Sequence, residues 1–248
     1  MKTAIIIPAR LASTRLPGKP LLDLCGKPLI QHVVERATAV SMVDQVIVAT
    51  DDAGIFACVE KFGGEARMTR QSHQSGSERV AEVAATLDAE VIINLQGDEP
   101  EIDPDHINLL INAQKKFAPF ASTLVCPFPK TGQIDDVAAV KVQLGASLDP
   151  GVWHAERFSR DPKKINLENG AHGGSQHYLH LGVYAFARSS LFRFAAEPPS
   201  PTEREERLEQ LRILDMGEKI VAVKVPSSTP GIDTPEDLEA ARQRFALR

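Results

Sequence analysis

The chain has 248 residues, of which 43% are hydrophobic and 25% are charged, and its formal net charge is −5. This length suits one α/β core with at most a small appendage, and the composition excludes a disordered or collagen-like chain. The acidic balance also argues against a general nucleic-acid surface, which needs an excess of basic residues.

The cysteines and the start of the chain favour a cytoplasmic protein. The three cysteines, Cys25, Cys58 and Cys126, lie far apart and include no CxxC pair, which favours a reducing compartment over a disulfide or zinc framework. The apolar run at residues 4–7 is too short for a signal-peptide core or a membrane span. We therefore expect no membrane partner.

Strand and helix patterns alternate in the first part of the chain. Near-continuous apolar runs at residues 4–7, 46–49 and 91–95 predict buried parallel strands. Between them, apolar residues recur at helical spacing over residues 29–40 and 80–87. The alternation predicts an α/β core.

The last third of the chain continues the mixed pattern. Residues 179–186 and 220–225 predict strands, and the charged segment 203–216 predicts one helix. A final helix has a clear start, because Thr234 can cap it and Pro235 occupies its first position.

Residues 151–178 differ from the rest, since they contain seven charged residues, four glycines and no sustained periodicity. This pattern predicts a loop or hairpin excursion, and long excursions of a compact domain are often functional. We expect residues 1–248 to form a single domain that carries this divergent excursion.

A basic segment follows the first predicted strand. The first 22 residues contain Lys2, Arg10, Arg15 and Lys19, with no acidic residue before Asp23. Backbone amides and fixed cations of this kind can hold a triphosphate. The glycine spacing fits neither a Walker A loop nor a dinucleotide loop. From the residues alone, an anion site and a plain basic surface loop are both open.

Two carboxylates stand at positions that suit a ligand site. Asp98 comes just after the strand at 91–95, where open α/β sheets bind ligands, and Asp233 directly precedes the last helix. Two such carboxylates can meet at one Mg²⁺, which prefers carboxylate and phosphate oxygens. The alternative is that one is a turn residue and the other only flanks a helix.

Seven motifs then follow in a fixed order along nearly the whole chain. They are IPARLASTRLPGKPL at 7–21, VATD at 48–51, HQSGSER at 73–79, NLQGDEP at 94–100, HLGVY at 180–184, LEQLR at 208–212 and IDTPED at 232–237. Together they resemble the 3-deoxy-manno-octulosonate (Kdo) cytidylyltransferase family, which makes CMP-Kdo for lipopolysaccharide. The resemblance implies an α/β nucleotide-diphospho-sugar transferase-like fold: a mixed, mainly parallel sheet flanked by helices, with a small extension that helps to form a homodimer.

The resemblance also implies the reaction and its phosphate end. The enzyme would be a Mg²⁺-dependent nucleotidyltransferase that transfers CMP from CTP to the anomeric hydroxyl of Kdo and releases pyrophosphate. Asp98 and Asp233 would bind Mg²⁺, and Arg10, Lys19 and Asp98 would be catalytic. No covalent protein nucleophile is required.

Further residues are implied as contacts to the two substrates, CTP and an acidic 2-keto sugar. They are Ser77 and Arg79 near the nucleotide, Gln96 near both substrates, where its amide can donate to phosphate or sugar oxygens, and His180, Tyr184, Glu209 and Gln210 near the sugar. Local alternatives stay open: a helix cap for Ser77, a polar turn for Gln96, a buried histidine with one hydrogen bond for His180, and a solvated helix face for residues 209–210.

The chain departs from the family pattern in one place. After the Val-Lys-Val segment at 140–142, the family shows a stretch like Tyr-Phe-Ser-Arg-Ala-x-Ile-Pro, of which this chain keeps only residues 158–160. Arg160 can pair with the sugar carboxylate through a two-pronged contact, or it can be a surface charge. Open alternatives are the same chemistry on an amino-Kdo analogue or another acidic 2-keto sugar, and a nucleotide-binding paralogue without turnover.

Overall fold

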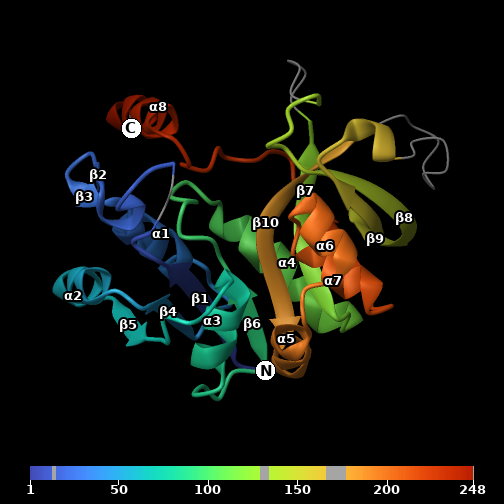
Figure 1. Ribbon diagram of the computed structural model, residues 1–248, viewed down its shortest axis with the longest axis horizontal. Coiled ribbons are helices and arrows are strands. Elements are labelled where there is room, and N and C mark those ends of the chain that lie inside the picture. Colours follow the sequence, from blue (N-terminus) through green and yellow to red (C-terminus); the bar gives the residue numbers. More distant parts are fainter. Residues whose placement is uncertain (13–14, 129–133, 166–176, 248) are drawn as a thin grey trace. The chain divides into compact units, whose positions relative to one another are not determined.

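The computed structural model describes the chain except for short gaps (Figure 1): it covers residues 1–12, 15–128, 134–165 and 177–247. Contacts within the chain define two compact units. Unit 1 comprises Met1–Asn108 and Thr229–Arg248, and unit 2 comprises Leu109–Ser228. The boundary falls inside helix α4 (Pro104–Phe117). Each unit is described by itself, and the single domain expected over residues 1–248 stays a prediction.

Unit 1 contains four parallel strands in the order β5-β4-β1-β6. Their bounds are β1 (Thr3–Ala9), β4 (Gln45–Thr50), β5 (Glu65–Met68) and β6 (Val91–Asn94). In the centre, Ile5 pairs with Val46 on one side and with Ile93 on the other. Ile5, Ile6 and Ile7 are fully buried, as expected for a parallel strand that is covered on both faces. The strands predicted at 4–7, 46–49 and 91–95 are confirmed.

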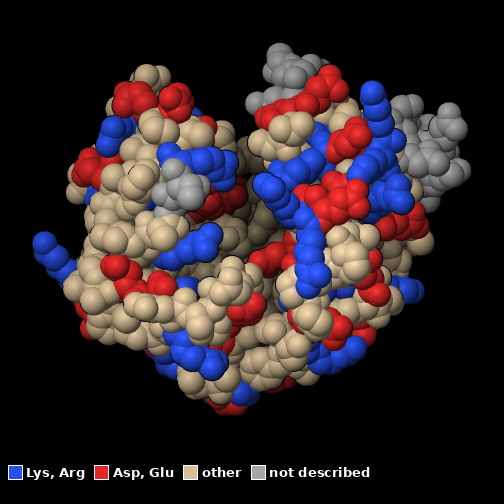
Figure 2. Space-filling model, viewed as in Figure 1, with Lys and Arg blue, Asp and Glu red and all other residues tan. Residues whose placement is uncertain are grey.

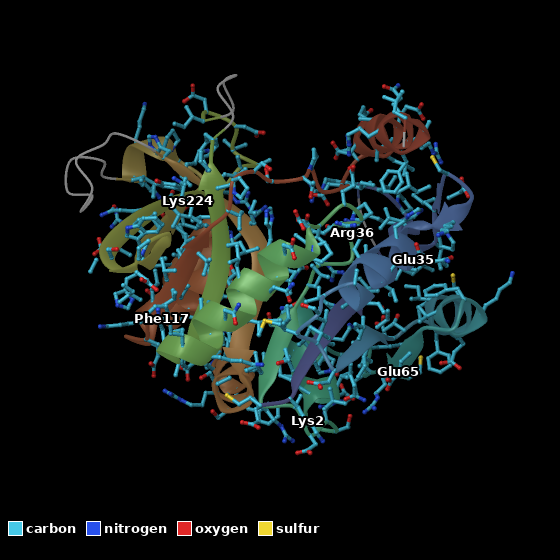
Figure 3. All side chains as sticks on the ribbon, turned by 180° about the vertical axis from the view of Figure 1, so that it is seen from behind. Lys2, Glu35, Arg36, Glu65, Phe117 and Lys224 are labelled. Carbon is cyan, nitrogen blue, oxygen red and sulfur yellow. The ribbon has the colours of Figure 1, made fainter. Side chains whose placement is uncertain are left out.

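Helices and one small hairpin complete unit 1. They are η1 (Lys19–Leu21), β2 (Asp23–Leu24), β3 (Lys27–Pro28), α1 (Leu29–Thr38), α2 (Ala53–Lys61), α3 (Gly76–Ala84) and α8 (Pro235–Ala246). Helix α1 buries the apolar stripe predicted for it, including Ile30 and Val33. From the same helix, Arg36 Nε donates to the carbonyl of Ile102 at 2.8 Å (Figure 3). The helix therefore also holds the chain that follows β6.

The predicted start of the last helix is confirmed. Thr234 Oγ1 accepts from the backbone N–H of Asp237, and the Asp237 carboxylate accepts from the N–H of Thr234, which makes a reciprocal capping box. Pro235 fills the first turn, where its missing N–H does no harm. This cap fixes the backbone directly beside Asp233.

Unit 2 contains five strands in the order β10-β7-β11-β9-β8. Their bounds are β7 (Ala121–Pro127), β8 (Lys141–Asp149), β9 (Val152–Ser159), β10 (Tyr178–Ala187) and β11 (Ile220–Lys224). Only β7 and β11 run parallel, and β10 also pairs with β8, which links the two ends of this order. At the end of β11, the Lys224 ammonium lies 5.5 Å from the Tyr178 ring centroid (Figure 3). With the parallel strands of unit 1, the sheet architecture is mixed.

The predicted excursion at 151–178 begins as a regular strand. Strand β9 pairs with β8 in a hairpin and with β11 on its other side, and η2 (Pro162–Lys164) follows it. Trp153 and Ala155 are buried between more exposed neighbours, so the segment has the alternating period of a strand. Of the two predicted alternatives, the hairpin is therefore confirmed for β9 and the loop is not, while residues 166–176 lie outside the described part of the chain.

Helix α5 (Arg188–Ala196) follows β10. The prediction of a single helix at 203–216 is wrong, because this segment contains two short helices, α6 (Pro201–Glu206) and α7 (Gln210–Asp215). Arg207 ends α6 in the left-handed conformation, with φ of 55°. Glu203 and Arg212 join the two helices through a buried ion pair of 2.5 Å. Across the described ranges, every helix is too short or too polar to cross a membrane.

Candidate functional site

An open cavity of about 500 Å³ lies in unit 1 at the carboxyl ends of β1 and β6. It is lined by Pro8, Ala9, Arg10, Ala12, Arg15, Lys19, Pro20, Gln96, Gly97, Asp98 and Asp233. Parallel strands direct their carboxyl ends to one edge, which is why residues far apart in the sequence meet here. The cavity thus collects the predicted residues Arg10, Lys19, Gln96, Asp98 and Asp233.

The Lys19 ammonium lies between the two predicted metal carboxylates. Its Nζ is 2.8 Å from Asp98 Oδ2 and 3.0 Å from Asp233 Oδ1. Although burial opposes its charge, the two carboxylates raise the pKa of Lys19 above its usual value. Arg15 adds a second cation 3.1 Å from Asp233 Oδ2. The sequence-predicted cation and carboxylates therefore form one charge network in this structure.

Backbone and side-chain contacts hold Asp233 beside Asp98. The N–H of Ile232 donates to the carbonyl of Asp98 at 3.0 Å, so the chain before α8 is tied to the turn after β6. At the far end of α8, Arg244 Nη2 lies 2.6 Å from the buried carboxylate of Glu101. Together with the Thr234 capping box, these contacts hold both ends of α8 and so fix the position of Asp233, which directly precedes the helix cap.

Figure 2 shows basic and acidic side chains interspersed over the visible face. Next to Asp98 in the chain stands a third acid, Glu99. Burial, and then repulsion by Asp98 and Asp233, raise the pKa of Glu99 to about 8, while Lys19 opposes the rise. Burial and the two neighbouring carboxylates thus favour the protonated form of Glu99.

The donor set agrees with a hard divalent cation. Asp98 and Asp233 offer carboxylate oxygens, the atoms that Mg²⁺ prefers. Among the described residues, however, no group of three or more His, Cys, Asp or Glu side chains could hold a metal ion. An ion at this position would therefore take its remaining ligands from phosphate oxygens and water, as magnesium commonly does.

Ser77 and Arg79 do not line this cavity. Arg79 is only 4% exposed, and its guanidinium contacts Thr69 and forms a 3.1 Å ion pair with Asp51. Ser77 is equally buried and accepts from Asn94 Nδ2 at 3.3 Å. In this structure both side chains are committed to contacts within unit 1, and their predicted contact with nucleotide stays a prediction.

The predicted sugar residues lie in unit 2, where β10 brings two of the rings together. The ring centroids of His180 and Tyr184 are 5.4 Å apart, and those of His180 and Phe158 are 5.1 Å apart in a T-shaped arrangement. Burial lowers the pKa of His180 to about 3, so its ring is neutral at physiological pH. His180 Nε2 lies 3.0 Å from Thr123 Oγ1, which confirms the local expectation of a histidine with one hydrogen bond.

Two buried polar atoms here have no partner among the described residues: the Tyr184 hydroxyl and Gln210 Nε2. Burial, and then the nearby Glu209 carboxylate, raise the pKa of Tyr184 well above its usual value, so the hydroxyl keeps its proton. Gln210 is 5% exposed at the start of α7, which rules out the solvated-face alternative for it. Unpaired buried polar groups are costly, so each of these atoms is expected to pair with a water molecule or a ligand.

Arg160 contacts the backbone in this structure. Its Nη1 donates to the carbonyls of Val137 and Ala138, each at 3.0 Å. The fully buried ammonium of Lys141 donates to the carbonyls of Asp136, Ala139 and Arg160 itself, at 2.6, 2.9 and 2.8 Å. The two cations thus tie the chain at 136–139 to the end of β9.

Several residues of these sites escaped the sequence predictions. Arg15 had been noted only as part of the basic segment, and its role beside Asp233 needed the fold. The acidic run after β6 contains the signal for Glu99, since a carboxylate next to a proposed metal ligand is a candidate for a shifted pKa. Lys141 and Thr123 gave no signal in the sequence, because an isolated lysine or threonine in a strand is ordinary.

Comparison with known proteins shows the family of the chain. Residues 4–220 match the family model described as Cytidylyltransferase. The chain is 41% identical over 255 residues to a 3-deoxy-manno-octulosonate cytidylyltransferase from Pelobacter propionicus, covering 99% of this chain and 98% of the relative. It is 40% identical over 247 residues to a protein of the same name from Escherichia coli, covering 99% and 96% of the two chains.

Solved structures give the same result. A CMP:2-keto-3-deoxy-manno-octonic acid synthetase complexed with CTP superposes with a TM-score of 0.90 at 41% identity, covering 100% of this chain and 99% of that one. A UDP-glucose pyrophosphorylase with UDP-glucose, at 15% identity and a TM-score of 0.70, covers 100% and 99% and shares the fold. The nucleotide-diphospho-sugar transferase-like fold is confirmed, and the chain belongs to the 3-deoxy-manno-octulosonate cytidylyltransferase family.

Proposed function

We propose that this chain transfers CMP from CTP to the anomeric hydroxyl of Kdo and releases pyrophosphate. The observation that carries the proposal is the charge network at the unit 1 cavity, in which Lys19 lies 2.8 Å from Asp98 and 3.0 Å from Asp233. Substrate identity is supported by the relatives of the same family name and by the similar protein whose structure contains CTP.

Arg10 and Lys19 provide the charge stabilisation of the reaction. Both line the cavity, where they would neutralise the triphosphate of CTP and then the departing pyrophosphate. The raised pKa of Lys19 keeps it cationic at neutral pH. The sugar hydroxyl would attack the α-phosphorus in line, and positioning with charge stabilisation suffices without a protein nucleophile. Gln96, also at the cavity, would donate to phosphate or sugar oxygens.

Magnesium is part of the same proposal. Asp98 and Asp233 would hold it, and bound Mg²⁺ would neutralise negative charge on the phosphate oxygens of CTP. The ion would share Asp98 and Asp233 with Lys19, which contacts one oxygen of each carboxylate.

The unit 2 residues provide the sugar contacts in this proposal. The unpartnered Tyr184 hydroxyl and Gln210 Nε2, with Glu209 beside Tyr184, suit a polyhydroxylated ligand that both donates and accepts hydrogen bonds. Arg160 is proposed for the sugar carboxylate. Since its Nη1 already serves two backbone carbonyls, recognition would use its remaining guanidinium nitrogens.

Two further properties follow from family membership alone and are proposals. We propose that the protein acts in the cytoplasm, where CTP is present, and that it forms a homodimer. Size measurement of the purified chain by light scattering tests the second statement, because a monomer and a dimer of a 27.0 kDa chain differ twofold in mass.

The reaction is tested by pyrophosphate release from CTP and Mg²⁺ with a panel of acidic sugars: Kdo, an amino-Kdo analogue and another acidic 2-keto sugar. We expect Kdo to give the highest kcat/KM, together with CMP-Kdo as the product. A higher kcat/KM with another sugar would reassign the acceptor. CTP binding without pyrophosphate release on any sugar would instead identify a paralogue that has lost turnover.

A further inference from the structure

Strand β10 contains an irregularity beside the predicted sugar residues. Its ladder with β7 pairs Leu181 with Leu124 and Tyr184 with Thr123, so two residues of β10 have no partner on β7. Such a bulge leaves backbone groups without their ladder hydrogen bonds. The Thr123 hydroxyl fills this gap, because its Oγ1 lies 2.8 Å from the carbonyl oxygen of Val183 and 3.2 Å from that of Leu181.

The same hydroxyl contacts a third group, the ring of His180, with 3.0 Å between Oγ1 and Nε2. A hydroxyl has one proton and two lone pairs. The 2.8 Å separation from the Val183 carbonyl has the length of an O–H···O hydrogen bond, and without a proton between them two oxygen lone pairs would face each other. The proton therefore belongs to the bond with Val183.

With its proton used in this way, Thr123 offers only lone pairs to the histidine. His180 Nε2 must then carry a hydrogen and donate it, so the ring is the Nε2–H tautomer. Thr123 is fully buried and cannot exchange this contact for water. Burial also lowers the pKa of His180 to about 3, so the ring stays neutral and its other nitrogen, Nδ1, keeps a free lone pair.

The surroundings leave that lone pair for a ligand. In the described part of the chain, the recorded hydrogen bond of the His180 ring is the one at Nε2, and the rings of Phe158 and Tyr184 restrict its orientation. A neutral acceptor can receive a hydrogen bond from a hydroxyl but not from a carboxylate, which has no proton to give. The histidine is therefore matched to a hydroxyl of the sugar and not to its acidic group.

We propose that Thr123 is a positioning residue that holds His180 as its Nε2–H tautomer, so that Nδ1 accepts a hydrogen bond from a sugar hydroxyl. The second half of this inference rests on the proposed function, because it requires a sugar to be the ligand. The first half concerns the free protein alone. The two halves can therefore be tested separately.

The test combines nitrogen NMR of the histidine rings with kinetics on the full chain. In ¹⁵N-histidine protein without ligand, assigned with the help of His180→Asn, we expect Nδ1 of His180 to be unprotonated and Nε2 to carry the hydrogen. Thr123→Ser should keep this tautomer, and Thr123→Val should lose it. Thr123→Val should also raise the KM for Kdo about tenfold, while kcat and the KM for CTP change less than about twofold.

A neighbouring residue supplies the matched control. Ser122 is fully buried too, and its hydroxyl donates to Gln114 Oε1 at 2.7 Å on the opposite face of β7. Ser122→Ala should therefore lower the melting temperature as Thr123→Val does, but leave the His180 tautomer and the KM for Kdo unchanged. This separates positioning of the histidine from a general loss of stability.

Different results contradict different statements. An Nδ1–H ring in the free wild-type protein would overturn the inference at once, even if Thr123→Val did not fold. An unchanged KM for Kdo in a folded Thr123→Val protein that has lost the tautomer would overturn the link to sugar binding. A wild-type protein with the Nε2–H tautomer that turns over no Kdo would refute the proposed function while supporting the role of Thr123.

Discussion

The candidate residues of unit 1 and those of unit 2 differ in how their polar atoms are partnered. In unit 1 the charged groups neutralise one another, with Lys19 between Asp98 and Asp233. In unit 2 the ring of His180 is neutral, and the Tyr184 hydroxyl has no described partner. A ligand of the first group must exchange existing ion pairs, so its binding should depend on salt and metal. A ligand of the second group completes hydrogen bonds that are missing, so its binding should depend on shape.

The largest expected effect comes from removing a charge in unit 1. Asp98→Asn or Asp233→Asn should lower kcat for pyrophosphate release about 100-fold or more, because each removes a proposed metal ligand and one partner of Lys19. Rates at saturating Mg²⁺ and circular dichroism of each variant check this. Asp88→Asn is the control, since that carboxylate pairs with Lys2 on the surface and is 91% exposed. Turnover near the wild-type rate at limiting Mg²⁺ would remove the metal assignment.

Substitution of Lys19 should have a smaller effect, which weakens the binding of CTP and strengthens that of Mg²⁺. Lys19→Met should raise the KM for CTP about tenfold, because a phosphate cation is lost, yet it should tighten Mg²⁺ binding to the free protein. The second change follows because Asp98 and Asp233 lose their internal counter-ion. Calorimetric titration with MgCl₂ measures it. Lys27→Met, which removes a surface partner of Glu35, should change neither value. Unchanged or weaker Mg²⁺ binding by Lys19→Met would contradict the shared use of these carboxylates.

The smallest expected effect tests whether His180 is neutral. Its folded pKa of about 3 lies below the usual value of 6.5, so between these values the unfolded chain binds a proton that the folded chain does not. This contribution to stability is therefore present above pH 6.5 and is lost as the pH falls toward 3. Denaturant unfolding of His180→Asn between pH 4 and 7 should depend less on pH than that of the wild type. Tyr184→Phe, which changes the same surroundings without removing the histidine, should keep the wild-type slope.

Much of the fold could be predicted because its elements follow local rules. The apolar runs became buried strands, and Thr234 with Pro235 began the last helix as predicted. The prediction of one continuous helix at 203–216 was wrong because the chain breaks at Arg207. This residue has a left-handed conformation, which a non-glycine residue adopts only when its surroundings require it. For the segment of β9, a loop and a hairpin both stayed open, because charged residues interrupt its alternation of buried side chains.

The features of the candidate site also differ in how far the sequence could predict them. The places of Asp98 after a strand and of Asp233 before a helix are local features that left a plain turn residue and a helix flank open, and the family resemblance supported their pairing. The structure brings both carboxylates to Lys19. The burial of Arg79 against Asp51 could not be predicted from the sequence, because only the fold decides whether a cation faces a cavity or a neighbouring carboxylate. The missing partner of the Tyr184 hydroxyl is likewise a property of packing, which no spacing of residues encodes.

The division of unit 1 into Met1–Asn108 and Thr229–Arg248 has a consequence for the order of events during synthesis. A ribosome-bound chain that has not yet reached residue 229 already contains β1 and β6 with Lys19 and Asp98, but it lacks Ile232 and Asp233. Domains form as their segments emerge, and this one must wait for a segment encoded far downstream. The growing chain should therefore bind Mg²⁺ and CTP poorly, and the capacity for nucleotide transfer should appear abruptly when the segment that carries α8 is released.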